Sequence, residues 1–365
     1  MLKKFAVTNY RGFKKRIEFD FSKPRNYDNC QYAIKNGIIK DVMIYGPNGS
    51  GKSNIGFAMF DIIEHLTTNS KNDEQYVNFT YANNSLPVIF EYYFNFGGQE
   101  VKYIYSKYPN GILYEETFVA GQAEYFHKRD SQIVINKDYF NLSDSFIEEI
   151  RNNANNVSLV TSLVSSYPLP KDHILLQFFD FVKHMLWFRC LEDRGYAGFE
   201  SGNAKLDEYI ISQGLITDFA SFIERISGQH FDFLPADRNE KKLHCLIDGS
   251  DMLFREVAST GTDSLELLYY WYTKLNQVSL VFIDEFDAFY HFELASEVCK
   301  TLFNLDCQVI LTTHNTSLMT NDLLRPDCYY LIDGNQMKPI ADCTQKELRL
   351  GHNLEKIYRG EGFRL

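Results

Sequence analysis

The chain has 365 residues, enough for roughly two structural units of about 150 residues each. Its hydrophobic share of 45%, with 30 phenylalanines and 24 tyrosines, excludes a disordered chain, and 21 glycines and 9 prolines exclude a collagen-like one. The 37 basic and 48 acidic residues give a net charge of −11, which argues against a wholly basic nucleic-acid binder.

The cysteines and the apolar runs indicate the compartment. Seven cysteines occur without any C-x-x-C pair, which favours reduced thiols over a disulfide framework or a zinc knuckle. The first residues hold no apolar signal region, and no run of about 18 apolar residues is present. We therefore expect a cytoplasmic protein without a membrane span.

Three short apolar runs predict the core. Residues 42–45, 280–283 and 309–311 are continuously apolar, which is typical of strands buried on both faces of a parallel sheet. Apolar residues recur at helical spacing over 55–66 and again over 294–305. The sequence therefore predicts an α/β core whose two halves lie at opposite ends of the chain.

The region between these halves changes character twice. Residues 78–135 alternate aromatic and polar side chains around two glycine turns, which predicts an antiparallel meander. Residues 143–227 read as helices, including an apolar one over Ile174–Leu186, and 230–254 as a second short β region. We expect three parts: an N-terminal core part with the meander (1–140), a helical insertion (141–228), and a C-terminal core part with the tail (229–365).

A glycine-rich loop follows the first predicted strand. It matches G-x-x-x-x-G-K-[ST] and consists of Gly46, Pro47, Asn48, Gly49, Ser50, Gly51, Lys52 and Ser53. Its glycines allow backbone amides to turn toward phosphates at a positive helix end, where Lys52 adds a cation and the Ser53 hydroxyl can bind Mg²⁺. A simple glycine turn is the weaker interpretation, because strand, loop and helix occur in the required order.

Acidic and imidazole groups follow the other two predicted strands. Asp284 and Glu285 end the second strand, and we assign Asp284 to Mg²⁺ and Glu285 to the general base. His314 follows the third strand and is predicted to lie beside the γ-phosphate as a third catalytic group with Glu285 and Lys52. Asp287 is predicted to lie on the following loop, near an opposing subunit's nucleotide.

The segment Ser259-Thr260-Gly261 precedes a predicted helix. Taken alone, Ser259 is a helix N-cap. The order of all these motifs, however, resembles ABC-type AAA ATPases of the RecF-like and OLD-like group related to SMC proteins, from Asn9–Phe13 through His314. The resemblance implies an ABC-type P-loop fold, ATP and Mg²⁺ as ligands, and a homo-oligomer, at least a dimer, in which Ser259 and Gly261 contact the nucleotide of another subunit.

The C-terminal residues 347–358 extend the resemblance to stand-alone ATPases of bacterial anti-phage systems, such as PARIS, RloA and abortive-infection proteins. That likeness implies an ATP-driven switch, with a separately encoded, nuclease-type effector and a phage-derived protein as trigger. The alternative for this tail is an amphipathic helix packed on the core. We expect residues 349–363 and the helical insertion to dock the effector.

Other functions fit less well. An OLD-type nuclease needs a further domain, but only about 50 residues follow His314, and a transporter subunit has a different signature and a shorter insertion. A RecF-like or SMC-like DNA-repair ATPase shares every core motif and remains the alternative. DNA is thus a compatible partner but not a required one, and the basic residues within 3–16 are either a DNA-facing patch or a solvated hairpin face.

Overall fold

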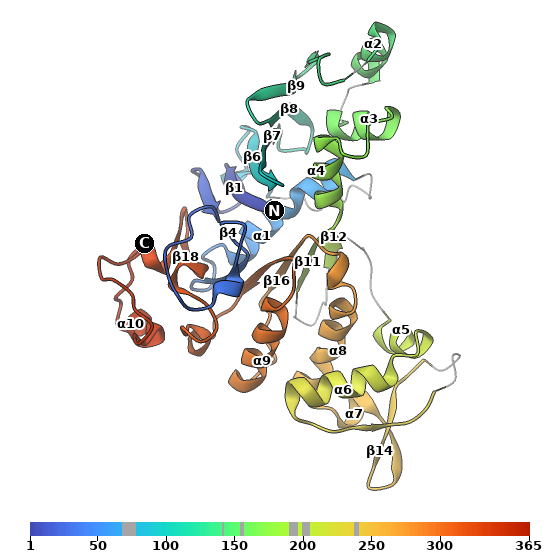
Figure 1. Cartoon of the computed structure of the whole chain (residues 1–365), viewed down its shortest axis with the longest axis vertical. Helices are drawn as coiled ribbons and strands as arrows, with labels where there is room; N and C mark the ends of the chain where they lie inside the picture. Colours follow the sequence, from blue (N-terminus) through green and yellow to red (C-terminus); the bar gives the residue numbers. More distant parts are fainter. Residues whose placement is uncertain (68–77, 141, 154–156, 190–195, 199–204, 237–240) are drawn as a thin grey trace.

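Figure 1 shows the computed structural model of the chain. The structure describes residues 1–67, 78–140, 142–153, 157–189, 196–198, 205–236 and 241–365. Parts of the expected helical insertion, at 141, 154–156, 190–195 and 199–204, lie outside the described residues. Two seven-stranded sheets form the core.

The first sheet carries the predicted parallel strands. Its strands, in spatial order, are β12 (Tyr196–Gly198), β11 (Met185–Arg189), β16 (Leu280–Asp284), β17 (Gln308–Thr312), β5 (Asp41–Tyr45), β18 (Tyr329–Asp333) and β19 (Gln336–Pro339). The five strands from β11 to β18 run parallel, and the two edge strands pair antiparallel. β5, β16 and β17 are buried throughout, as expected for a sheet covered on both faces.

The second sheet is antiparallel and includes the predicted meander. Its strands, in spatial order, are β10 (Gln132–Ile135), β9 (Ala123–Arg129), β8 (Leu113–Ala120), β7 (Gln99–Lys107), β6 (Val88–Phe96), β1 (Leu2–Thr8) and β2 (Ile17–Asp20). Alternating buried and exposed residues along β6 and β8 place one face inward, so the predicted period of two is confirmed.

One helix, α1 (Lys52–Leu66), packs between the two sheets. It contacts β11 and β16 on one side, and Gly56 leaves room there for the Phe282 ring, 2.8 Å from where a Cβ would lie. On its other side the Tyr92 hydroxyl of β6 donates to the carbonyl oxygens of Ala58 and Met59, both at 3.1 Å. The helix that begins at the glycine-rich loop is therefore held between the two layers (Figure 1).

The opposite face of the parallel sheet is covered by α8 (Thr260–Tyr272) and α9 (Phe292–Phe303) (Figure 1). Trp271 of α8 stacks on Phe188 of β11, with ring centroids 5.9 Å apart. α9 connects β16 to β17 and is the expected crossover helix. These observations confirm the predicted α/β core with a parallel sheet and an antiparallel β subdomain.

The predicted helical segment is present but interrupted. Its helices are α2 (Asp144–Asn153), α3 (Leu159–Ser166), α4 (Ile174–Lys183), α5 (Leu206–Ser212) and α6 (Ile216–Ser227). The expected helix over Ile174–Leu186 was wrong at its end: it stops at Lys183, and β11 begins at Met185. Both elements are apolar, so the sequence shows no boundary between them. The segment thus supplies two strands of the main sheet.

A small unit lies at one end of the molecule (Figure 1). It combines α5 and α6 with α7 (Phe254–Val257) and a three-stranded sheet, and this sheet confirms the short β region predicted for 230–254. Its strands are β13 (Asp232–Phe233), β14 (His244–Ile247) and β15 (Ser250–Leu253). Phe219 of α6 packs edge-on against Phe254, 5.8 Å between centroids, so the unit has an apolar cluster of its own.

The C-terminal tail packs on the core. α10 (Leu354–Arg359) buries Leu354, and Phe363 beyond it is 9% exposed. Asn321 Nδ2 holds the preceding turn through the carbonyl oxygens of Leu350 and His352, both at 3.0 Å. Throughout the described ranges, every helix is too short or too polar to cross a membrane.

Candidate functional site

The glycine-rich loop lies between β5 and α1 as predicted. A Cβ on Gly46 would come within 2.5 Å of the Ile332 carbonyl oxygen on β18, so only glycine fits this approach. Gly51 has φ +108°, and a Cβ there would lie 2.6 Å from the ring of Phe13. Pro47, Asn48 and Gly49 at the crest of the loop are exposed. The loop is therefore packed at both ends and open in the middle.

Lys52, the first residue of α1, points back into this loop. Its side chain is 6% exposed, and Nζ donates to the carbonyl oxygens of Gly46 at 2.8 Å and Pro47 at 3.2 Å. Burial lowers the pKa of Lys52, while the negative charges of Glu285 and Asp284 act in the opposite direction. The lysine cation thus lies among loop carbonyls, within the electrostatic reach of two carboxylates.

Parallel pairing brings the other predicted residues to the same sheet edge. β17 lies between β5 and β16, with Thr312 in register with Ile44 and Leu311 with Ile283. The residues that follow these three strands therefore share one edge with the loop after β5. Glu285, Lys52 and two further acids all influence the pKa of His314, which places them in one electrostatic cluster.

Thr312 is the residue that fixes the acidic pair, and no motif pointed to it. Its Oγ1 donates to Asp284 Oδ1 at 2.7 Å and accepts the Glu285 N–H at 2.7 Å. Asp284 is fully buried. Glu285 has φ +48°, a left-handed conformation that is uncommon for a side chain of this size and is found at functional sites. One hydroxyl thus orients one carboxylate and holds the backbone turn of the next.

His314, on the loop after β17, and Asp287, on the loop after β16, lie close to this pair. His314 is largely exposed. The burial of part of its side chain and, secondly, the charge of Lys52 lower its pKa, which favours a neutral imidazole. Asp287 is half-buried, and its Oδ2 accepts from Thr313 Oγ1 at 2.8 Å. Burial raises the pKa of Asp287. Asp287 is thus tied to the strand end of its own chain.

The residues present fit a nucleotide with a divalent cation. Two buried oxygens at this edge, Asp284 Oδ2 and Ser50 Oγ, have no hydrogen-bond partner among the described residues. Ser53 lies half-buried in the first turn of α1, where backbone N–H groups have no helical acceptor. Carboxylate and hydroxyl oxygens are the ligands that Mg²⁺ prefers. Asp284 and Ser53 are the residues that could hold such a cation.

Ser259 and Gly261 lie elsewhere in the chain. Ser259 caps α8, since its Oγ accepts the Thr262 N–H at 3.2 Å. A Cβ on Gly261 would lie 2.8 Å from the Phe289 carbonyl oxygen, in the loop that follows Asp287. Among the described residues, the hydrogen bonds of Ser259 and the near neighbours of Gly261 do not include the glycine-rich loop. The segment therefore contacts the loop after β16 in its own chain.

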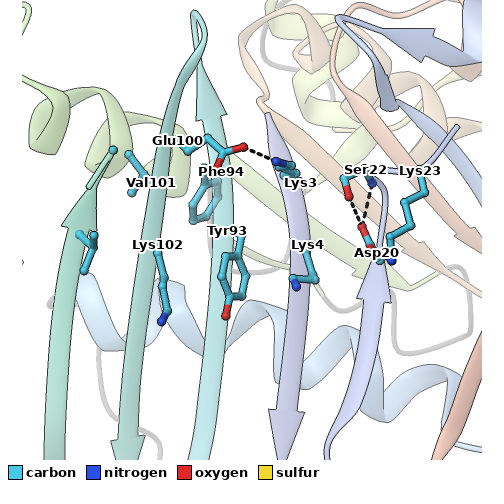
Figure 2. Close-up of a pocket in the computed structure, with 12 residues that line it drawn as sticks. Lys3, Lys4, Asp20, Ser22, Lys23, Tyr93, Phe94, Glu100, Val101 and Lys102 are labelled. Carbon is cyan, nitrogen blue, oxygen red and sulfur yellow. Dashed lines mark hydrogen bonds and ion pairs between the residues drawn. The ribbon is translucent and has the colours of Figure 1, made fainter. Parts of the chain in front are cut away.

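A hollow lies on the outer face of the antiparallel sheet, and basic residues near the N-terminus line part of it (Figure 2). Lys3 pairs with Glu100, and Lys23 with Asp20 at 3.0 Å. Lys4 lies 4.4 Å from the centre of the Tyr93 ring. Four lysines and two carboxylates line the hollow, so it carries a net positive charge although Lys3 and Lys23 are paired.

Comparisons with known proteins bear on the family. The family model described as "AAA domain, putative AbiEii toxin, Type IV TA system" matches residues 42–320, more than half of the chain. A search of curated proteins found no match.

Solved structures show weaker likenesses. An SMC head domain from Thermotoga maritima has a TM-score of 0.45 at 15% identity, covering 93% of this chain and 98% of that chain. An Smc head domain with a coiled coil and joint from Pyrococcus yayanosii has a TM-score of 0.48 at 10% identity, covering 99% of both chains. The recombination mediator RecF with ATP has a TM-score of 0.36 at 14% identity, covering 93% and 98%.

The family model alone decides the assignment. It spans β5 with its glycine-rich loop, the Ser259 segment, the acidic pair after β16 and His314. The chain belongs to the AAA-domain family that this description names.

Proposed function

We propose that this chain is an ATPase that binds ATP with Mg²⁺ and hydrolyses it at the edge formed by β5, β17 and β16. The observation that carries the proposal is the meeting of the glycine-rich loop with Asp284, Glu285 and His314 at one sheet edge. At that edge, Asp284 Oδ2 and Ser50 Oγ have no hydrogen-bond partner among the described residues, which supports a polar ligand there.

The proposed roles follow from position and chemistry. Lys52 and the loop amides bind the β- and γ-phosphates, and Ser53 with Asp284 holds the cation. Bound Mg²⁺ neutralises phosphate charge and polarises the terminal phosphoryl group. Glu285, whose backbone is fixed by Thr312, accepts a proton from the attacking water, and neutral His314 donates a hydrogen bond to the phosphoryl oxygens.

We further propose that the active form is at least a dimer. Ser259 and Gly261 are expected to complete a nucleotide site. Within one chain, however, Gly261 lies against the loop after β16 and not against the glycine-rich loop. Their place at the exposed start of α8 is compatible with contact to a second subunit's nucleotide, near Asp287.

A mixing experiment tests this arrangement. Ser259→Arg should block hydrolysis without weakening ATP binding, and Lys52→Ala subunits should be inactive. When the two are mixed and allowed to re-equilibrate, each mixed dimer keeps one intact site, so part of the activity should return. Absence of recovery in a mixture shown by mass measurement to contain mixed dimers would contradict composite sites.

The biological role we propose is a switch in bacterial anti-phage defence of the abortive-infection type, triggered by a phage-derived protein. The family description names a putative AbiEii toxin of a Type IV TA system, and this mention of abortive infection and of a paired system supports a defence role with a separately encoded partner. We propose a nuclease-type effector as that partner. Co-purification from the native gene neighbourhood, followed by mass measurement, tests this. Toxicity or nucleic-acid cleavage by the isolated chain would contradict a separate effector.

A RecF-like or SMC-like repair function is the second candidate, favoured by the shared motifs. The hollow of Figure 2 has a local excess of lysines that fits this candidate, although Lys3 and Lys23 are paired with carboxylates. DNA-stimulated ATP turnover of the isolated chain, together with salt-dependent DNA binding, would favour this candidate over the defence role.

A further inference from the structure

Arg189, the last residue of β11, faces the proposed nucleotide site although no sequence motif includes it. The parallel register pairs Arg189 with Asp284 on the neighbouring strand. Its Nε lies 3.6 Å from Asp284 Oδ2, and its side chain is 28% exposed whereas that of Asp284 is 0% exposed. In the described part of the chain, this guanidinium is the one cation within 4 Å of the buried carboxylate.

The contact is looser than a structural ion pair. Arg325 and Asp327, both buried, form two hydrogen bonds of 2.9 and 2.7 Å in the same chain. By contrast, Arg189 Nε and Asp284 Oδ2 each lack a hydrogen-bond partner among the described residues. A buried carboxylate needs compensation, and a permanent arginine partner normally supplies it through a tight two-bond contact. Arg189 therefore compensates Asp284 while keeping hydrogen-bonding capacity for another anion.

The free oxygen of Asp284 is the one that Arg189 approaches, because Oδ1 already accepts from Thr312. A divalent cation that binds Asp284 through Oδ2, the oxygen without a hydrogen bond, competes with the guanidinium for it. Two cations at one oxygen repel each other, so the arginine has to leave when the metal binds. The planar fork of arginine matches phosphate oxygens, and a triphosphate is the anion expected at this edge.

We propose that Arg189 senses the nucleotide: it balances Asp284 in the nucleotide-free chain and turns to the terminal phosphate of ATP when a metal occupies Asp284. The proposal rests on the proposed function, because it requires that this edge binds ATP with Mg²⁺. ADP lacks the terminal phosphate, so the contact would distinguish ATP from ADP.

The test compares the affinities for ATPγS and ADP in the presence of Mg²⁺ by titration calorimetry. Arg189→Met should weaken ATPγS binding by about 10-fold or more and ADP binding by less than about 2-fold, the range expected for loss of one charge-assisted contact. Arg16→Met is the matched control, because Arg16 also pairs with a carboxylate, Glu91 at 2.7 Å, on the surface of the other sheet. The control should leave both affinities unchanged.

Two failures can be told apart. If the wild-type chain binds neither nucleotide, the proposed function fails; if it prefers ATPγS and Arg189→Met keeps the same preference, the arginine proposal fails. Should Arg189→Met not fold because Asp284 is left uncompensated, the comparison moves to Asp284→Asn with and without Arg189→Met. There the double variant should lose ATPγS preference relative to Asp284→Asn alone, and equal preferences would overturn the proposal.

Discussion

Two buried polar groups at opposite ends of α1, Asp61 and Ser50, differ in the partners they have. Toward the C-terminal end, Asp61 Oδ2 accepts from the Tyr105 hydroxyl at 2.8 Å and from Lys107 Nζ at 2.7 Å. At the N-terminal end, Lys52 is bound only to loop carbonyls, and the nearby Ser50 Oγ has no partner among the described residues. Asp61 is thus saturated with partners, whereas Ser50 at the other end has capacity left over.

This difference distinguishes buried polar groups that stabilise the fold from buried polar groups that are available to a ligand. Unpaired buried polar atoms cost stability, so most such atoms in a fold are satisfied. The Asp61 cluster ties α1 to β7, although Glu64 Oε2 nearby has no hydrogen-bond partner among the described residues. The edge around Asp284 leaves oxygens unsatisfied, a cost that a bound ligand would remove. If this account is right, substitutions at the two ends should have separable effects on stability and on ligand binding.

Lys52→Ala should have the largest effect on ligand binding. Removal of the cation leaves the phosphates without compensation in a partly dehydrated loop, so we expect ATP affinity to fall by about 100-fold or more. Circular dichroism should show an unchanged fold. ATP binding at the wild-type affinity, measured by calorimetry, would contradict the assignment of the glycine-rich loop.

Lys107→Met should show the opposite profile. It leaves Asp61 buried beside Tyr105 without its cation, which should lower the free energy of unfolding by about 3 kcal/mol, the scale for breaking a buried pair. ATP affinity should stay unchanged in the folded variant. Lys102→Met, on the exposed side of the same strand, is the control and should change stability by less than about 0.5 kcal/mol. If urea unfolding gave the same free energy of unfolding for Lys107→Met and Lys102→Met, the structural role of the Asp61–Lys107 pair would be contradicted.

Glu64, near Asp61 at the C-terminal end of α1, should produce a smaller and pH-dependent effect. Burial, then the charge of Asp61, raises its pKa from 4.5 to about 7. The folded chain thus holds this proton more tightly than the unfolded chain does. The resulting stabilisation is complete below about pH 4.5 and is lost as the pH rises through about 7.

Glu64→Gln should remove that dependence. We expect the variant to gain about 1 kcal/mol relative to the wild type between pH 5 and pH 8, with allowance for partial solvent exposure. Urea unfolding at the two pH values measures the difference. An identical pH slope in both proteins would show that Glu64 ionises normally.

The sequence predicted the elements whose local pattern and motif agree. The loop Gly46–Ser53 lies between a buried strand and a helix, and the strands before Asp284 and His314 are parallel neighbours as expected. Parallel strands buried on both faces leave continuous apolar runs, and polar residues follow where they end. That combination is readable without any tertiary information.

Features that depend on distant contacts were not predicted. β11 follows α4 after a single residue, His184. Because both elements are apolar, the pattern predicts one helix over both. Arg189 therefore had no assigned place, although its register with Asp284 brings it to the site. The role of Thr312 was equally hidden, because a threonine at a strand end is common and only the neighbouring strand reveals its two hydrogen bonds.

The central claim is that the edge around Asp284 and Glu285 hydrolyses ATP. The most direct test measures ATP binding and ATP turnover on the same preparations of wild type and Glu285→Gln. The amide keeps the shape of the side chain and the backbone bond to Thr312 but cannot accept the proton. The account predicts wild-type ATP affinity with turnover at least about 100-fold slower. Turnover at the wild-type rate in the variant would contradict it.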